Sequence, residues 1–229
     1  MCLGLQKGIA GMEIILSVEK VRGNTIILFE SGWKVYLKKN QNPGVPLISG
    51  TVVDREQFEK QILLQQYPSA LDNAVRLLAQ RARSKKEMED RLKTSGYDPS
   101  VIELVLYKLS KEKLLDDRNF SAQWAESRMK KYGPSRIYRE LLSKGISREM
   151  AGEALEPFTD EEQVANAAAF AARKLSASED LRDRAKLFQR LSGMLIRRGY
   201  SWEVTKKACN VVLEEYENPA FREEDESRD

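Results

Sequence analysis

Three glycines, Gly96, Gly145 and Gly199, lie 49 and 54 residues apart and have matching neighbours. Four residues before each glycine is a leucine (Leu92, Leu141 and Leu195). Directly after each glycine is a bulky apolar residue (Tyr97, Ile146 and Tyr200), and the next residue can cap a helix (Asp98, Ser147 and Ser201). Apolar residues also recur five and nine positions past each glycine: Val101, Met150 and Val204; Val105, Ala154 and Ala208. Glycine readily adopts the left-handed conformation that ends a helix, and the capping residue begins the next one. The pattern therefore predicts a mainly α-helical tandem array of three three-helix repeats, rather than one irregular helical domain.

Prolines and capping residues delimit the helices of repeat 1, residues 67–115. We expect its first helix to open at Pro68, because proline is well placed in a first helical turn. Ser84, with Glu87 three residues on, has the spacing of a capping box and predicts the start of the second helix. Asp98 is expected to cap the third.

Repeat 2, residues 116–158, begins at a carboxylate pair that suits the positive end of a helix dipole. Its third helix is expected to end near Pro157. Repeat 3, residues 159–216, opens with an alanine-rich helix, followed by a longer helix that is expected to run to about Arg198.

The chain before the repeats has a different periodicity. Residues 12–18, 25–29 and 33–38 are rich in β-branched and aromatic residues or alternate between apolar and polar ones, which predicts a small antiparallel β meander. A loop is expected at 40–50, and then a helix capped by Asp54 that packs on the meander. The expected organisation is a flexible leader (1–12), the meander plus one helix (13–66), the three repeats, and an acidic disordered tail (217–229).

The net charge of +3 hides an uneven distribution. Residues 214–229 contain eight acidic and two basic residues, so the remaining chain carries a net charge of +9. A basic body with a short acidic tail favours a polyanionic partner such as DNA or a protein–DNA complex.

Several function classes receive no support from the sequence. The chain has no histidine and no glycine-rich nucleotide loop, so histidine-based catalysis, a phosphate-binding loop and histidine metal sites are absent from it. Its two cysteines, Cys2 and Cys209, have no metal-type spacing, and we expect Cys209 to be a buried apolar residue. We expect no cofactor, no metal and no membrane segment, since no apolar run approaches the ~20 residues that a span requires. A cytoplasmic protein is expected.

Two motifs resemble the RecX family, the bacterial regulators of the RecA recombinase. Residues 79–88 contain the family's opening, Arg-x-Arg-Ser-x-x-Glu followed by an apolar residue, and residues 115–121 resemble its hydrophobic-Asp-Asp-x-x-Phe-Ala motif, with Ser121 in place of alanine. Lys144-Gly145-Ile146 matches a third short motif of the family, Lys-Gly followed by Ile or Val. The likeness covers about residues 70–158; repeat 3 matches by pattern only, and the meander resembles the N-terminal extension of long-form members.

The resemblance implies tandem three-helix repeats and a protein without enzymatic activity. RecX-like proteins lie in the groove of the RecA–single-stranded DNA filament and modulate, usually inhibit, ATP hydrolysis, strand exchange and co-protease function in DNA repair and the SOS response. We accordingly expect the RecA filament as partner, with direct contact to single- or double-stranded DNA left open, and a monomeric protein. The family fixes no catalytic residues, so none is assigned.

Basic residues form three candidate partner-binding patches. The first patch comprises Arg81, Arg83, Lys85 and Lys86; the second comprises Arg128, Lys130, Lys131, Arg136 and Arg139; the third is a helical stripe of Arg182, Lys186, Arg190 and Arg197. Gly193 lies within the arc of the third patch and would let a backbone approach closely. Each patch is equally compatible with an ordinary solvated helix face. The aromatic residues Phe120, Trp124 and Phe188 are expected in the core.

Two alternatives remain open at this point. A free-standing helix-turn-helix DNA-binding module is disfavoured, because the basic residues are spread over three repeats instead of one recognition helix. An enzyme is the least favoured reading, because no catalytic motif is present.

Overall fold

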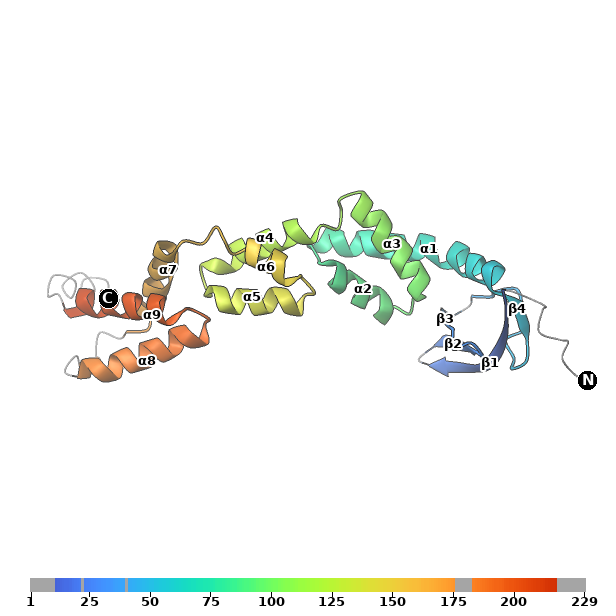
Figure 1. The fold of residues 1–229 in the computed structure, drawn as a ribbon, viewed down its shortest axis with the longest axis horizontal. Coiled ribbons are helices and arrows are strands. Elements are labelled where there is room, and N and C mark those ends of the chain that lie inside the picture. Colours follow the sequence, from blue (N-terminus) through green and yellow to red (C-terminus); the bar gives the residue numbers. More distant parts are fainter. Residues whose placement is uncertain (1–10, 22, 40, 176–182, 218–229) are drawn as a thin grey trace, which may run out of the picture. The chain divides into compact units, whose positions relative to one another are not determined.

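The computed structural model describes residues 11–21, 23–39, 41–175 and 183–217 (Figure 1). The chain forms two compact units, the N-terminal unit of residues 1–116 and the C-terminal unit of residues 117–229. Most of the expected leader, the expected break at 176–180 and all but the first residue of the expected tail lie outside the described residues.

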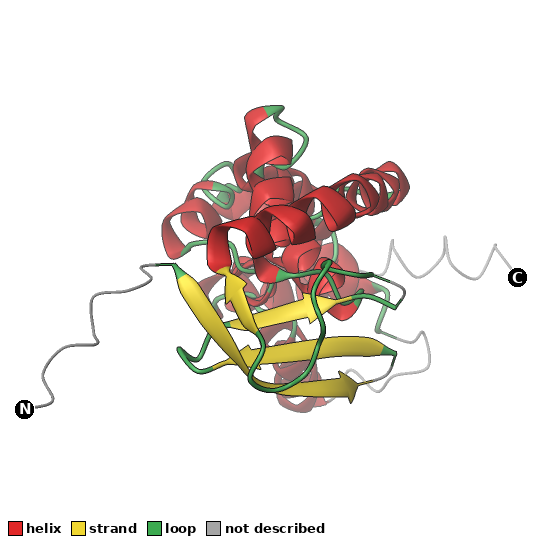
Figure 2. Ribbon diagram, turned by 90° about the vertical axis from the view of Figure 1, so that its right-hand side faces the viewer, coloured by secondary structure: helices red, strands yellow, loops and turns green. Residues whose placement is uncertain are grey.

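The N-terminal unit begins with a four-stranded antiparallel sheet of strand order β3-β2-β1-β4 (Figure 2). Its strands are β1 (Met12–Val21), β2 (Asn24–Phe29), β3 (Lys34–Leu37) and β4 (Val52–Asp54). The predicted meander is confirmed, while β4 was not expected. Three residues are too few to show a period of two, and β4 forms by pairing with Met12–Ile14 of β1.

A single helix, α1 (Arg55–Gln80), connects the sheet to the repeats. The prediction that one helix ends before Pro68 and another opens there is wrong, because Pro68 lies inside α1 at an exposed position. The first half of α1 covers the sheet with Phe58 and Ile62, and the second half buries Ala70 and Ala74 in the same core. Packing on both sides of the proline offsets the backbone hydrogen bond that it removes.

Repeat 1 is completed by α2 (Lys85–Thr94) and α3 (Pro99–Lys111). Ser84 caps α2 by accepting a hydrogen bond from the Glu87 amide (3.1 Å), and Asp98 caps α3 through the Ser100 amide (3.0 Å), as predicted.

A ring of hydrogen bonds joins the sheet to repeat 1. The fully buried Gln66 side chain donates to the Tyr36 carbonyl (2.7 Å) and accepts from the Asp98 amide (2.8 Å). The Asp98 carboxylate in turn accepts from the Tyr36 amide (2.9 Å). These bonds satisfy the outer edge of β3, so sheet and repeat 1 share one interior.

The C-terminal unit contains six helices among its described residues: α4 (Asp117–Met129), α5 (Pro134–Ser143), α6 (Arg148–Glu153), α7 (Asp160–Ala172), α8 (Arg184–Arg197) and α9 (Trp202–Glu217). Helix α6 ends at Glu153, earlier than the predicted end near Pro157, and residues 154–157 form a turn in which the Leu155 amide donates to the Gly152 carbonyl (2.9 Å). Helix α7 begins at Asp160, where the sequence predicts it to start, and Thr159 caps it in a full capping box with Glu162.

The three repeating glycines all end helices in the left-handed region, with φ of 78° at Gly96, 81° at Gly145 and 91° at Gly199. This confirms the turn that the repeat pattern predicted. Phe120 is buried in the core of repeat 2 (α4–α6), and Trp124 packs against that core. Phe188 packs partly buried on the core of repeat 3 (α7–α9), and Cys209 is fully buried there, where burial raises its pKa to about 11.

Candidate functional site

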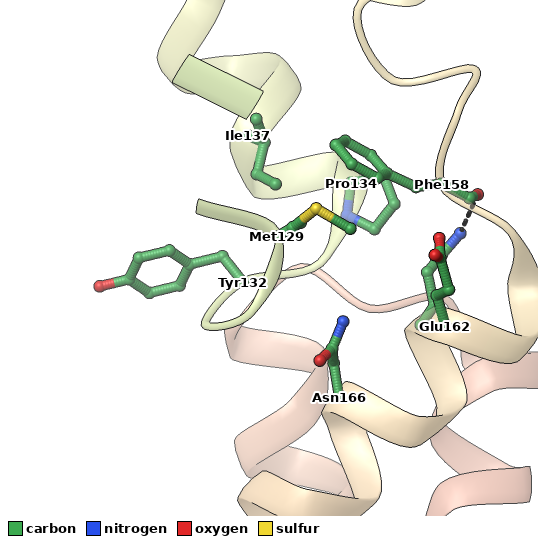
Figure 3. A pocket seen from close by; sticks show the side chains of 8 residues that line it. Met129, Tyr132, Pro134, Ile137, Phe158, Glu162 and Asn166 are labelled. Atoms are coloured by element: carbon green, nitrogen blue, oxygen red, sulfur yellow. Dashed lines mark hydrogen bonds between the residues drawn. The ribbon is translucent and has the colours of Figure 1, made fainter. Parts of the chain in front are cut away.

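The described part of the molecule offers surfaces for a partner more readily than a cavity for a small molecule. The hollow beside Met129, Pro134 and Phe158 holds about 10 Å³, room for roughly one water molecule (Figure 3). Gln163 also lines the hollow, and its side chain donates to the Phe158 carbonyl (3.2 Å). Sites for drug-sized ligands occupy about 300–1,000 Å³. Within the described residues, no helix is both long and apolar enough to cross a bilayer.

In the first patch, two arginines hold a helix junction together. Arg81 forms two hydrogen bonds with Glu87 of α2 (2.9 and 3.3 Å). Arg83, only 7% exposed, donates from Nε to the Leu77 carbonyl near the end of α1 (3.2 Å). Burial, together with the positive charges of Arg81 and Arg91, lowers the pKa of Arg83. The side chains of this patch that reach the surface are those of Lys85, Lys86 and, in part, Arg81.

Beside this junction lies a polar hollow of about 230 Å³ that the sequence did not indicate. It is lined by Arg81, Arg83, Glu87, Asp90, Arg91 and Thr94. Arg91 follows Glu87 by one helical turn, and this spacing was the available signal for its position. The hollow contains acidic as well as basic groups, so it is not a purely cationic site.

In the second patch, Arg128 and Arg136 are held by a carboxylate and aromatic rings. Both approach Glu140 (3.5 and 3.3 Å), which also accepts from the Trp124 indole (3.1 Å). The Arg128 guanidinium lies over the Trp124 ring (4.5 Å), and that of Arg136 lies over Tyr132 (3.9 Å). These two arginines are therefore part of the packing of repeat 2.

The remaining basic residues of the second patch extend into solvent. Lys130 and Lys131 are exposed at the end of α4, and Arg139 is exposed on α5, where its Nε donates to the Ser135 carbonyl (3.2 Å). These three residues are better placed for a partner than Arg128 and Arg136.

Two basic residues that the sequence analysis did not choose immediately precede repeating glycines. Lys144 lies over the Trp124 ring (4.0 Å). Arg198 lies over Phe170 (3.7 Å) and near Tyr132 (5.4 Å), and it donates to the Lys131 carbonyl (2.6 Å). Their shared position before the helix stop was the signal that could have identified them.

Repeats 2 and 3 meet at two glycine turns. The Gly133 amide donates to the Arg198 carbonyl (3.0 Å), and the Ser135 amide donates to the Gly199 carbonyl (3.2 Å). A Cβ on Gly133 would lie 2.4 Å from the Gly199 carbonyl carbon. Close backbone approach within the chain thus occurs at Gly133 and Gly199, whereas a Cβ on Gly193 would meet only an Arg197 nitrogen at 3.4 Å.

In the third patch, α8 carries Lys186, Arg190 and Arg197, while Arg182 lies outside the described residues. Lys186 and Arg197 are exposed, and Arg190 donates to the Lys174 carbonyl (3.2 Å). Trp202, which was not singled out from the sequence, is 54% exposed and meets Phe188 edge-to-face at 6.2 Å.

Comparison with known proteins places each repeat in one family. The models described as the first, second and third three-helix domains of RecX match residues 70–109, 116–155 and 160–209.

Curated relatives agree with this match. Regulatory protein RecX of Listeria welshimeri is 32% identical over 71% of this chain and 61% of its own length, and that of Bacillus subtilis is 34% identical over 69% and 59%. The chain thus spans about 60% of the length of these two relatives. RecX of Mycobacterium ulcerans is 36% identical over 62% of this chain and 81% of its own.

Solved structures support the fold. The RecX structure from Lactobacillus salivarius matches with a TM-score of 0.58 at 23% identity, over 65% of this chain and 97% of that one. A second structure, of regulatory protein RecX, also matches with a TM-score of 0.58; it is 21% identical, and the match covers 86% of this chain and 99% of that one. Three matched domains in tandem, together with these relatives, show that the chain belongs to the RecX family.

Proposed function

We propose that this protein is a non-catalytic regulator that binds the RecA–single-stranded DNA filament in its groove and inhibits ATP hydrolysis, strand exchange and co-protease activity. The observation that carries the proposal is the tandem match of all three repeats to RecX domains. The exposed cations at Lys130, Lys131 and Arg139 support it, because such side chains suit a polyanionic surface.

The structure changes which residues should be altered to test this proposal. Replacing Arg128 would remove its packing on Trp124 and its ion pair with Glu140, so lost binding could reflect damage to repeat 2. Lys130 and Lys131 have exposed side chains, and their joint replacement by alanine removes two charges from the surface alone.

The test measures RecA ATPase and strand exchange on single-stranded DNA with the natural protein and with Lys130→Ala/Lys131→Ala. Lys206→Ala/Lys207→Ala is the matched control, since it removes another exposed pair of adjacent lysines from a helix, α9. We expect the first variant to need about tenfold more protein for half-maximal inhibition, because two phosphate or carboxylate contacts are lost, and the control to behave like the natural protein. Equal effects of both pairs would show that only net charge matters.

The dose of protein distinguishes two modes of action. Groove binding requires near-stoichiometric protein per RecA, whereas capping of filament ends would act far below that ratio. Unchanged ATPase and strand exchange at every dose would contradict the proposal, and saturable, sequence-selective binding to duplex DNA without RecA would favour a helix-turn-helix regulator.

A further inference from the structure

Helix α8 has an unusual charge composition. Its fourteen residues include Arg184, Lys186, Arg190 and Arg197 and no acidic residue, whereas every other helix that the structure describes contains at least one. Lys186, Arg190 and Arg197 share one face of the helix, which we call the α8 face. Lys186 and Arg197 are exposed and Arg190 also donates to the Lys174 carbonyl (3.2 Å), so an anion that approaches this face is attracted by three positive charges.

The chain leaves the described structure beside the start of α8. Glu217, the last residue of α9, forms an ion pair with Arg184 in the first turn of α8 (2.5 Å). The following residues, 218–229, include Glu223, Glu224, Asp225, Glu226 and Asp229 against two arginines, a net charge of −3.

The length of this segment matches the distance to be covered. Twelve residues reach at most about 40 Å, whereas Lys186 and Arg197 are separated by about 17 Å of helix. The path around a helix about 10 Å in diameter, from Arg184 to the α8 face, also fits within this reach. The acidic run at 223–226 lies roughly 20–30 Å of chain beyond Glu217 and so reaches the middle of the α8 face.

We infer that residues 218–229 bind intramolecularly to the α8 face and compete there with the anionic partner. The occupant is this segment and not a second molecule, because it starts beside the first turn of α8 and is therefore present at a millimolar effective concentration. The consequence for filament binding rests on the proposed function. If the α8 face contributes to filament binding, the segment lowers the apparent affinity for the filament, because only molecules with an uncovered face can bind through it.

The contact itself is tested without any partner. Backbone amide NMR spectra of the full chain and of a variant ending at Glu217 are compared in low salt and in 0.5 M NaCl, where the Debye screening length is roughly 4 Å. We expect shifts at Lys186 and Arg190 that vanish at high salt and do not change with protein concentration. Superimposable spectra for residues 184–197 would overturn the inference, and so would shifts that grow with concentration.

The competition is tested by fluorescence anisotropy with a single-stranded oligodeoxythymidylate as the polyanionic probe, and with RecA filaments. Glu223→Gln/Glu224→Gln should tighten binding about threefold, and removal of residues 218–229 about fivefold. Glu214→Gln/Glu215→Gln is the matched control, because it removes two exposed charges from α9 itself and should have a smaller effect. Equal tightening by the control would overturn the competition.

The two proposals fail in distinguishable ways. If neither the natural protein nor any variant binds filaments or affects RecA, the proposed function fails, while the NMR comparison still decides whether the segment contacts α8. If filaments bind but the segment's removal changes neither spectra nor affinity, only the intramolecular contact is refuted.

Discussion

The turns at Gly96 and Gly199 occupy equivalent positions in repeats 1 and 3, yet they have different neighbours. A Cβ at Gly96 would meet the side chain of Asn24 in β2, whereas a Cβ at Gly199 would meet the backbone of Arg136 in repeat 2. One turn receives a flexible side chain from the sheet, and the other receives the main chain of another repeat. The glycine that ends a helix in each repeat thus also forms a packing contact, and how well it tolerates substitution depends on the residue packed against it.

The strongest test of this comparison is Gly199→Ala. We expect a loss of about 3 kcal/mol or more in unfolding free energy, because a left-handed φ of 91° is strained for alanine and the Arg136 amide nitrogen lies 2.5 Å from the new Cβ. Urea unfolding followed by circular dichroism measures it. Gly152→Ala in α6, where a Cβ has open space, is the control and should not destabilise. A loss below about 1 kcal/mol at Gly199 would show that the two repeats separate easily.

Gly96→Ala should have an intermediate effect of about 1–2 kcal/mol, because the backbone strain remains but the Asn24 amide can rotate away. A double-mutant cycle with Asn24→Ala separates these two contributions. We expect a coupling of about 0.5 kcal/mol, since removing the amide relieves the collision and leaves the strain. A loss equal to that of Gly199→Ala would mean that both turns are equally rigid.

Adjacent arginines at the end of α8 provide a third test. Arg198→Ala should cost about 1 kcal/mol of unfolding free energy, since it removes a hydrogen bond to Lys131 and the packing on Phe170. Arg197→Ala, at an exposed position, should stay within about 0.5 kcal/mol of the natural protein but weaken filament binding. If Arg197→Ala lowered the unfolding free energy and Arg198→Ala left it unchanged, the contacts of this junction would be contradicted.

The smallest effect is expected for Gly193→Ala. Gly193 lies within α8 and has ordinary space around it, so alanine should raise the unfolding free energy by up to about 1 kcal/mol through its better helix propensity. Thermal unfolding measures the change. Weaker filament binding by this more stable variant would indicate that a partner's backbone does approach the helix there.

Local features were predictable from the sequence. The three glycine turns and the caps Ser84 and Asp98 involve residues within one or two helical turns, so their spacing alone specified them. Long-range features were not predictable. Strand β4 exists because Met12–Ile14 pairs with it, and α1 passes through Pro68 because both of its halves are packed.

The candidate site shows the same division. The basic patches were visible as runs of charge, but the sequence could not separate arginines that pack against their own repeat from lysines that extend into solvent. Arg128 and Arg136 lie against the surface of repeat 2 because Glu140, Trp124 and Tyr132 converge on them from two helices and the turn between them. The role of Arg198 could not be predicted from the sequence, because its partners, Phe170 and the Lys131 carbonyl, lie 28 and 67 positions earlier in the chain.

The continuity of α1 has a practical consequence for dissecting this protein. A fragment starting at residue 67 would begin in mid-helix, would lack Gln66, and would strip the Asp98 amide of its acceptor. A defect in such a fragment could therefore arise from damage to repeat 1 as well as from loss of the sheet. The sheet's own contribution is better assessed by altering its outward-facing side chains, such as Leu16 and Val52, in the intact chain.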